Sequence, residues 1–479
     1  MRAGFFETDI TPALGMERPG GYGKAYCDTL HDPLKVRAAV FDDGDTAAAL
    51  VGIDSCMIEA DTVHAARQRI CKRCGVPVEN IMIGASHTHS GGPLPGPFPE
   101  DVADASELVR TLVLEQSIVG DPFYREWVIG QIETAVCEAH RRCVPVTCSV
   151  GSGSEAEAVH NRRFHMKSGR VCSHPGKGNP DILGPAGPID PEVGVLAAWT
   201  AGGQLAGCVV NYACHGTTGP GGVSADWIHY LEQTIRGVMG EDAVVVFLNG
   251  ACGDVTQVDN LSLRARESGE SVARTVGTRV GAEVLKVLTT AARDDLTPVR
   301  VCRRTLRIPR RPPSAKSLER ARKLFEDTGQ SPERSSAERI FAKERLVLEH
   351  MISQRPEIDA EVQAVQIGPA LFLSNPAEYF CSLGLRIKKE SPFPFTYVVE
   401  LANGSIGYVP DTEAFAADGG GYETVLTSYA NLVPEAGNMI ADASIELASK
   451  LRPGLVPSAE TVAGPQPVWD YGNLGPELE

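Results

Sequence analysis

Ile81-Met82-Ile83-Gly84-Ala85-Ser86-His87-Thr88-His89-Ser90-Gly91-Gly92-Pro93 is the stretch that decides the fold of this chain. Ile81–Ala85 is a short apolar run typical of a buried strand, and the closing Gly-Gly-Pro turns the chain. His87 and His89 therefore lie where a strand passes into a loop, a common place for catalytic groups. Because residues two apart in a strand point to the same face, the two imidazoles can converge on one point. A metal ion suits such a pair, and the alternative is a pair of hydrogen-bonded histidines near a turn.

Apolar strands alternate with helical segments along the rest of the chain. The expected strands are 36–40, 47–53, 81–85, 144–150, 195–199, 208–212, 244–248, 299–308, 361–367, 370–373 and 396–401. The expected helices are 60–74, 124–142, 227–239 and 272–290. This alternation predicts an α/β protein in which mixed β-sheets are flanked by helices.

The composition is that of a globular protein and argues against several classes of function. The chain has 479 residues, of which 43% are hydrophobic and 22% charged, with a formal net charge of −16. Nucleic acids and anionic membranes need clustered positive charge, so we expect neither as a partner. Residues 194–214 carry no charge, but Ala201-Gly202-Gly203-Gln204 divides them into two strand-length pieces. This stretch therefore predicts a hairpin rather than a membrane span.

The cysteines and the N-terminus bear on the compartment. Thirteen cysteines are scattered along the chain, many in apolar context, which predicts buried thiols rather than a disulfide framework. Glu7 and Asp9 interrupt any apolar signal segment after Met1. These features favour a cytoplasmic location and leave open a mature secreted form whose signal has been removed.

Two segments differ from the α/β pattern. Residues 312–355 are charge-rich, almost free of glycine and helical in pattern. They indicate a helical arm inserted before the strand at 361, which serves as a lid or a contact between copies of the chain, or is simply a solvated hairpin. Residues 452–479 contain five prolines and predict an irregular tail. We therefore expect one catalytic domain over residues 1–451.

Polar residues follow strands at four further places. His215, Glu378 and Tyr408 each come shortly after an apolar run. Residues 249–256 follow another run, and their small side chains would let backbone N–H groups approach a substrate oxyanion. Donor groups at the ends of several strands are typical of the rim of an α/β active site.

In their order along the chain, these segments resemble the neutral/alkaline (non-lysosomal) ceramidase family, a group of zinc-dependent amidases. The resemblance runs from about Gly4 to Leu447, and eight short matches in the family's order are more specific than any one of them. The matching segments are Leu30-His31-Asp32-Pro33-Leu34, Ser86–Pro93, Asn161-Arg162-Arg163, His215-Gly216-Thr217, Gly253-Asp254-Val255-Thr256, Pro376-Ala377-Glu378, Tyr408-Val409-Pro410-Asp411 and Tyr422–Thr427.

The resemblance implies that Zn²⁺ is bound by His87, His215, Glu378 and Tyr408. Two imidazole nitrogens, a carboxylate and a phenolate oxygen form a donor set that suits this ion. His89 is then expected beside the metal but not bound to it.

The resemblance also implies a catalytic role for four residues: His89, Arg162, Tyr422 and Thr256. Arg162 and Tyr422 match family residues that contact the scissile amide, and Thr256 stands where the family has a serine. The alternatives are a surface salt bridge for Arg162 and simple packing for the tyrosines.

Departures from the family bear on the substrate. The Gly/Pro-rich loop 161–191 is locally basic, which predicts a polar pocket, and this sequence stops where ceramidases continue into an immunoglobulin-like domain. We therefore expect a zinc-dependent amidohydrolase that cleaves a C–N amide bond of a polar small molecule by a metal-activated water. The alternatives are a true ceramidase, which hydrolyses N-acylsphingosine to sphingosine and fatty acid, and a non-catalytic metal-binding scaffold. A serine hydrolase is disfavoured because no Gly-x-Ser-x-Gly motif occurs.

Overall fold

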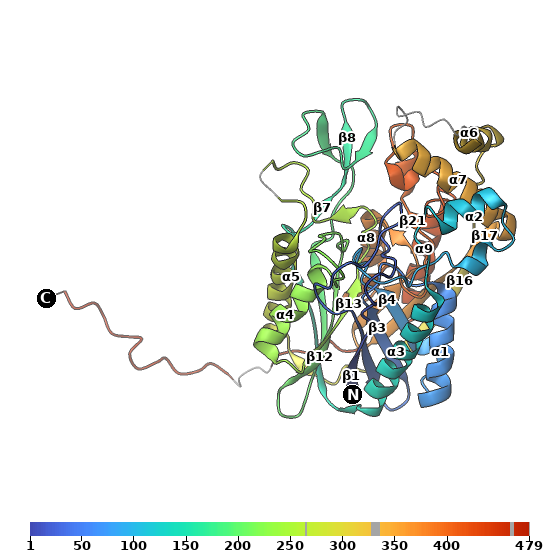
Figure 1. Ribbon diagram of the computed structural model, residues 1–479. Helices are drawn as coiled ribbons and strands as arrows, with labels where there is room; N and C mark the ends of the chain where they lie inside the picture. Colours follow the sequence, from blue (N-terminus) through green and yellow to red (C-terminus); the bar gives the residue numbers. More distant parts are fainter. Residues whose placement is uncertain (264–265, 327–335, 460–463, 479) are drawn as a thin grey trace.

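Three β-sheets form the frame of the protein, and a pair of helices covers the outer face of each one (Figure 1). The structure is a computed structural model that describes residues 1–263, 266–326, 336–459 and 464–478. The predicted α/β class with mixed sheets flanked by helices is confirmed.

The first sheet has the strand order β4-β3-β2-β1-β5. Its strands are β1 (Arg2–Asp9), β2 (Lys35–Asp42), β3 (Ala47–Ile53), β4 (Ile81–Ala85) and β5 (Val144–Pro145). Helices α1 (Ala60–Cys74) and α3 (Pro122–Arg141) cover its outer face. Helix α1 ends because Gly75 adopts a left-handed conformation and returns its N–H to the Cys71 carbonyl.

The second sheet has the order β13-β12-β11-β6-β15 and lies under helices α4 (Trp227–Met239) and α5 (Glu270–Thr290). Its strands are β6 (Thr147–Ser154), β11 (Glu192–Trp199), β12 (Leu205–Tyr212), β13 (Val244–Asn249) and β15 (Arg293–Asp294). Strands β11 and β12 are antiparallel neighbours, so the predicted hairpin in the uncharged stretch is confirmed. Within the described ranges, no helix has the length and apolar character needed to cross a bilayer.

The third sheet has the order β16-β17-β18-β20 and is covered by helices α8 (Cys381–Glu390) and α9 (Ala436–Ser449). Its strands are β16 (Val299–Pro309), β17 (Glu357–Ile367), β18 (Ala370–Ser374) and β20 (Phe395–Val399). The inner faces of the three sheets meet in one shared core, to which Phe41, Leu248 and Phe372 each contribute from a different sheet. The edges of all three sheets are thereby brought close to one another.

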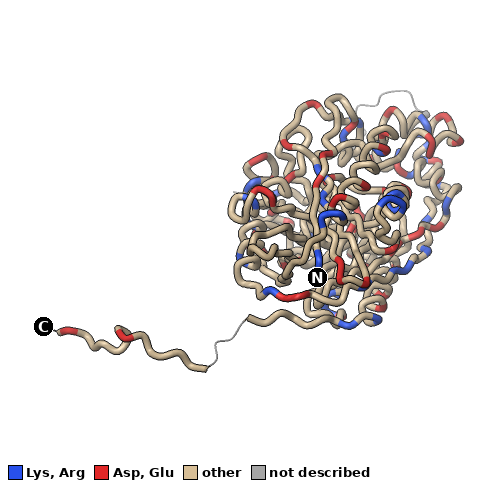
Figure 2. Tube along the Cα trace, turned by 90° about the horizontal axis from the view of Figure 1, so that it is seen from below, with Lys and Arg blue, Asp and Glu red and all other residues tan. Residues whose placement is uncertain are grey.

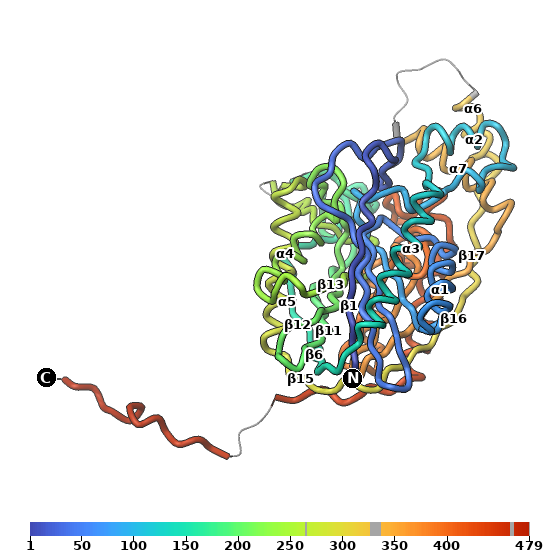
Figure 3. Tube along the Cα trace, turned by 60° about the horizontal axis from the view of Figure 1, so that its bottom comes forward, coloured from blue at the N-terminus to red at the C-terminus, as the bar shows by residue number. Residues whose placement is uncertain are grey.

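The predicted helical arm is present between β16 and β17, as α6 (Ala315–Glu326) and α7 (Ser336–Gln354). Its middle, 327–335, lies outside the described residues. The arm is not a solvated hairpin, because it shares a small apolar core with α2 (Glu107–Leu114), which follows the short helix η2 (Pro99–Val102). Figures 1 and 3 both show α2, α6 and α7 side by side at one end of the molecule.

Short elements complete the fold. They are β7 (His160–Asn161), β8 (Arg163–Met166), β9 (Val171–Ser173), β10 (Ile182–Pro185), β14 (Val255–Thr256), β19 (Glu378–Tyr379), β21 (Tyr408–Val409), η1 (Val78–Asn80), η3 (Thr412–Phe415) and η4 (Tyr422–Thr424). The prediction that residues 161–191 form an irregular loop is wrong, because much of this segment forms a small sheet of order β10-β8-β9. The predicted single strand 144–150 is also wrong. It divides after Pro145, which has no N–H to continue a ladder, and β5 and β6 join different sheets.

The described part of segment 452–479 has no helix or strand, and residues 464–478 extend away from the body (Figure 1). All thirteen cysteines lie in the described ranges and are free thiols. Basic and acidic residues are interspersed in the view from below (Figure 2).

Candidate metal centre

His87 reaches the site through a turn rather than through a strand. Strand β4 ends at Ala85, and His87 has a φ of 64°, in the left-handed region that few non-glycine residues adopt. The alternating geometry expected from the sequence is therefore wrong, although the two imidazoles do converge. Their Nε2 atoms lie 3.4 Å apart.

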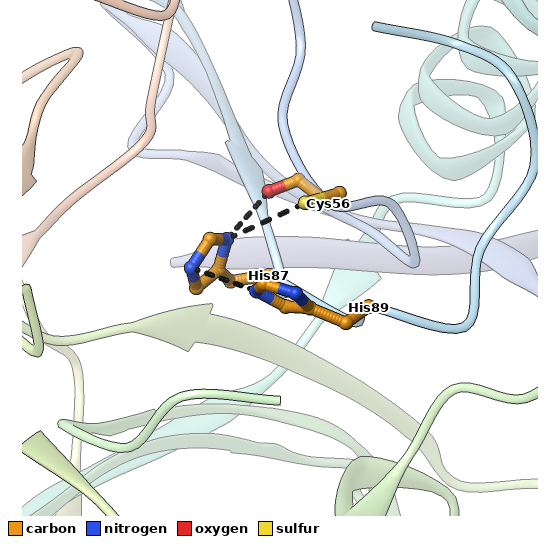
Figure 4. Close-up of side chains that lie close together, drawn as sticks. All are labelled: Cys56, His87 and His89. Carbon is orange, nitrogen blue, oxygen red and sulfur yellow. Dashed lines mark hydrogen bonds between the residues drawn. The ribbon is translucent and has the colours of Figure 1, made fainter. Parts of the chain in front are cut away.

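Main-chain carbonyls orient two of the predicted ligands. The Nδ1 atom of His87 lies 2.7 Å from the Cys56 carbonyl oxygen, and Nδ1 of His215 lies 2.7 Å from that of Cys252 (Figure 4 shows the first contact). A carbonyl accepts only, so each Nδ1 carries a proton, and in the neutral ring Nε2 then presents a lone pair. This is the arrangement in which imidazole binds a metal through Nε2.

Glu378 faces both lone pairs. Its Oε2 atom lies 3.3 Å from Nε2 of His87 and 3.6 Å from Nε2 of His215. That oxygen is buried and has no hydrogen-bond partner. Buried polar atoms are nearly always satisfied, so this unsatisfied carboxylate oxygen, which faces two imidazole nitrogens, fits a bound cation. The described residues thus place His87, His215 and Glu378 within ligand distance of one another.

The charges in this cluster are strongly coupled. Burial alone would raise the pKa of Glu378, but His87 and His215 outweigh it and hold the pKa well below its usual range. Burial lowers the pKa of His215, and the Arg162 guanidinium lowers it further. The site therefore contains an ionised carboxylate and one imidazole, His215, that stays neutral, which are forms that bind a metal, whereas Glu378 outweighs burial and raises the pKa of His87 well above its ordinary value.

Tyr408 is placed beside Glu378 by strand pairing. Strands β19 and β21 run parallel, with Glu378 opposite Tyr408. Burial raises the pKa of the Tyr408 phenol well above its ordinary value. Its hydroxyl lies 3.4 Å from that of Tyr422.

His89 lies at the edge of the cluster. Its Nδ1 donates to the Gly20 carbonyl over 2.9 Å, which leaves Nε2 as an acceptor next to His87. Cys56, His87 and His89 form a second group with metal-ligand spacing. The Cys56 sulfur lies 3.9 Å from Nδ1 of His87, whereas His89 faces Nε2, and one ion binds only one of these nitrogens. The geometry therefore favours the group with His215 and Glu378.

Arg162 is buried in the site, so the alternative of a surface salt bridge is wrong. Its Nε donates to Glu423 over 2.9 Å, and its Nη2 donates to the Gly253 carbonyl over 2.7 Å. Its Nη1 lies 3.0 Å from Nε2 of His215. The guanidinium also lies over the ring of Tyr422, 5.1 Å from its centroid. Arg162 is thus held rigidly beside the cluster of His87, His215 and Glu378.

Thr256 and the backbone before it are engaged elsewhere. The Thr256 hydroxyl accepts from the Val258 N–H, within a local turn. The Gly253 N–H donates to the Tyr379 carbonyl, and the Cys252 N–H donates to Glu400. The expectation that backbone N–H groups near Gly253 face a substrate oxyanion is therefore wrong, because these N–H groups tie the ends of strands together.

The 161–191 segment contributes to the site only in part. Arg162 points into the site, and the Ser173 hydroxyl donates to Glu423 over 2.6 Å. Arg163 instead donates to the Gly420 carbonyl, and His165 is exposed. Glu423 is a site residue that the sequence reasoning did not assign, although it directly follows Tyr422 in a matching segment.

The chain is similar to neutral ceramidases in part of its sequence and in its fold. No protein-family model matches the chain. A neutral ceramidase from Pseudomonas aeruginosa is 28% identical over 227 residues, which span 45% of this chain and 30% of that relative. A crystal structure of neutral ceramidase from the same organism superposes with a TM-score of 0.69 at 20% identity, covering 96% of this chain and 76% of that one. A structure of a ceramidase complexed with C2 superposes with a TM-score of 0.68 at 20% identity, covering 95% and 77%.

Proposed function

We propose that this chain, which is neutral-ceramidase-like in sequence and in fold, is a zinc-dependent amidohydrolase acting on an N-acyl compound. The observation that carries the proposal is the unpartnered Oε2 of Glu378, which faces Nε2 of both His87 and His215. Tyr408, opposite Glu378, is the fourth ligand in this proposal.

The residues around the cluster have different roles in the proposed hydrolysis. When bound, zinc supplies a Lewis acid and a water molecule whose pKa is lowered toward neutrality. His89 holds its Nδ1 proton on the Gly20 carbonyl, so Nε2 is the atom that takes a proton during hydrolysis. The Tyr422 hydroxyl and Nη1 of Arg162 are the donors available to a substrate oxygen that gains negative charge.

A polar small molecule is the substrate class that this site favours. Nη1 of Arg162 and the paired phenol groups border the cluster, and against an alkyl chain Nη1 would have no acceptor once Nε2 of His215 binds zinc. The second candidate is ceramide itself, which is favoured by the similarity to ceramidases. The absence of paired cysteines is consistent with a reducing compartment, so we propose a cytoplasmic location.

Metal analysis combined with a substrate screen tests the proposal. The purified protein should hold about one zinc ion per chain and hydrolyse short N-acyl amino acids or N-acetyl sugars faster than long-chain ceramide. Faster cleavage of long-chain ceramide, unchanged in Arg162→Lys, would establish the second candidate instead. Stoichiometric zinc with no hydrolysis of any amide would indicate a metal-binding scaffold.

The variant His89→Ala separates the metal from the chemistry. It should retain most of its zinc while turnover falls by roughly 10²–10⁴-fold, the range for loss of a general acid–base. Parallel loss of zinc and turnover would show that His89 is a ligand.

A further inference from the structure

A loop near the N-terminus covers the metal-binding cluster. We call residues 16–27 the roof loop; the Cys27 N–H donates to the Met16 carbonyl and closes it into a hairpin. The Gly20 carbonyl accepts from His89, and a Cβ atom at Gly20 would come within 2.7 Å of the His89 ring. The roof loop therefore lies directly on the imidazole that borders the cluster.

A second segment forms the adjoining wall. Tyr429 lies between the roof loop and the site, with its ring centroid 6.1 Å from that of Tyr22 and 6.4 Å from that of Tyr408. Its carbonyl accepts from the Tyr408 N–H over 2.7 Å. Any shift of Tyr429 is thus transmitted directly to the backbone of a proposed zinc ligand.

Lys343 of helix α7 ties the roof loop to the body. Its ammonium group donates to the Tyr22 carbonyl at 3.0 Å, the Gln116 carbonyl at 3.0 Å and the Ser117 hydroxyl at 2.8 Å. An ammonium group has three N–H donors, so all of them are used. Lys343 is only 4% exposed. A lysine is rarely buried this deeply unless its ammonium group is paired, as it is here.

The next residue, Glu344, ties the same helix to the second segment. Its carboxylate accepts from the hydroxyl of Ser428, the neighbour of Tyr429. The same carboxylate lies 3.5 Å from the Lys343 ammonium, so each buried charge has an opposite partner. Two consecutive residues of the helical arm therefore contact the two segments that enclose the site.

We propose that Lys343 and Glu344 are positioning residues that make the helical arm a brace, holding the roof loop and Tyr429 closed over the metal-binding cluster. The arm is rigid enough for this role because α6 and α7 share an apolar core with α2. The bracing itself is independent of the reaction, whereas its effect on catalysis rests on the proposed hydrolase function.

Hydrogen exchange measured by mass spectrometry on the full chain tests the brace. In Lys343→Met, amides of the roof loop should exchange at least tenfold faster than in the wild type, while those of β2 and β12 keep their rates. The matched control is Lys323→Met, because Lys323 lies on the same arm and pairs with Glu319 at the surface. Unchanged exchange of the roof loop in Lys343→Met would overturn the proposal.

Ser428→Ala is a milder variant in case Lys343→Met does not fold. It removes only the hydroxyl that links Tyr429 to the arm, so faster exchange should be confined to residues 425–431. Wild-type exchange in this segment would contradict the role of Glu344.

Kinetics and metal content separate positioning from general damage. On the best substrate found, Lys343→Met should raise KM at least fivefold with less than a twofold change in kcat, because only the fraction of molecules with a closed roof binds well. Zinc content should remain that of the wild type. Loss of zinc, or a fall in kcat alone, would overturn the positioning role. A wild-type protein without zinc or activity would contradict the proposed function but leave the exchange test valid.

Discussion

The orientation of His87 and His215 depends on backbone atoms of other residues. Both imidazoles donate Nδ1–H to carbonyls, those of Cys56 and Cys252, which no side-chain substitution removes directly. The backbone therefore sets the tautomer of both rings, and a substitution cannot easily change it. The carboxylate that faces both rings belongs to a single side chain, Glu378, and a substitution can remove it.

Glu378→Gln should consequently lower zinc affinity more than about a hundredfold, since a neutral amide replaces the ionised ligand. Cys56→Ala is the matched control, because it keeps the carbonyl and removes only the sulfur of the competing group. Titration against a chelator of known affinity measures both variants. Equal losses in the two would move the site to Cys56, His87 and His89.

Breaking the buried ion pair between Arg162 and Glu423 should lower the stability of the protein. Arg162→Met leaves the buried Glu423 carboxylate with only Arg163, 4.0 Å away, as a cationic neighbour, which costs up to roughly 3–5 kcal/mol in the free energy of unfolding. The double variant with Glu423→Gln should recover part of this loss, because no charge is then stranded. Urea unfolding of both variants measures their free energies of unfolding. Strictly additive losses of stability would contradict the coupling between Arg162 and Glu423.

At the scale of elements, the start of helix α1 carries a carboxyl group whose ionisation the fold opposes. Burial, together with Asp61 and Asp101, raises the pKa of Glu59 from 4.5 to about 7. The folded state therefore holds more protons than the unfolded state between these values, and stability falls as pH rises through this window.

Glu59→Gln should remove this pH dependence, which amounts to at most about 3 kcal/mol. The advantage of the variant over the wild type should be small at pH 5 and larger at pH 8. Thermal unfolding at both pH values measures it, with Glu79→Gln as a control in a neighbouring element. A constant difference across the range would refute the raised pKa.

Regular elements were predicted well and short ones poorly. Helices α1 and α4 occupy their predicted bounds because both have a helical hydrophobic pattern and both end at a glycine, Gly75 and Gly240. The two-stranded sheets near the site, β19 with β21 and β14 with β7, have strands of only two residues. Such strands contain no periodicity to detect, and only their partner across the chain creates them.

At the scale of the whole molecule, the body does not end where the last helix ends. The Gly454 N–H donates to the Gly368 carbonyl, and the Arg452 carbonyl accepts from Gln366, so these residues still pack on the third sheet. Leu455, by contrast, is 90% exposed.

Truncation after Pro457 should therefore leave the melting temperature within about 1–2 °C of the full chain, since few buried contacts are lost. Truncation after Leu451 should lower it by several degrees, because it leaves buried partners on the third sheet unsatisfied. Differential scanning calorimetry of the two forms tests this difference, and equal melting temperatures would contradict it.

The sequence by itself determined the α/β class, the inserted arm and the order of the chemical groups along the chain. These follow from local hydrophobic periodicity, glycine and proline signals and short motifs, which act over a few residues. Through the family resemblance that these motifs carry, the sequence also predicts the zinc ligands His87, His215, Glu378 and Tyr408.

Only the tertiary structure decided how these groups meet. The left-handed turn at His87, the carbonyl partners of the two imidazoles and the burial of Arg162 against Glu423 join residues far apart in sequence. The same holds for Lys343 and Glu344, which looked like part of a charged surface helix and are instead buried beneath loops from distant parts of the chain. The charge pattern of a helix cannot reveal such partners, because the contacts exist only after the three sheets have packed into one core.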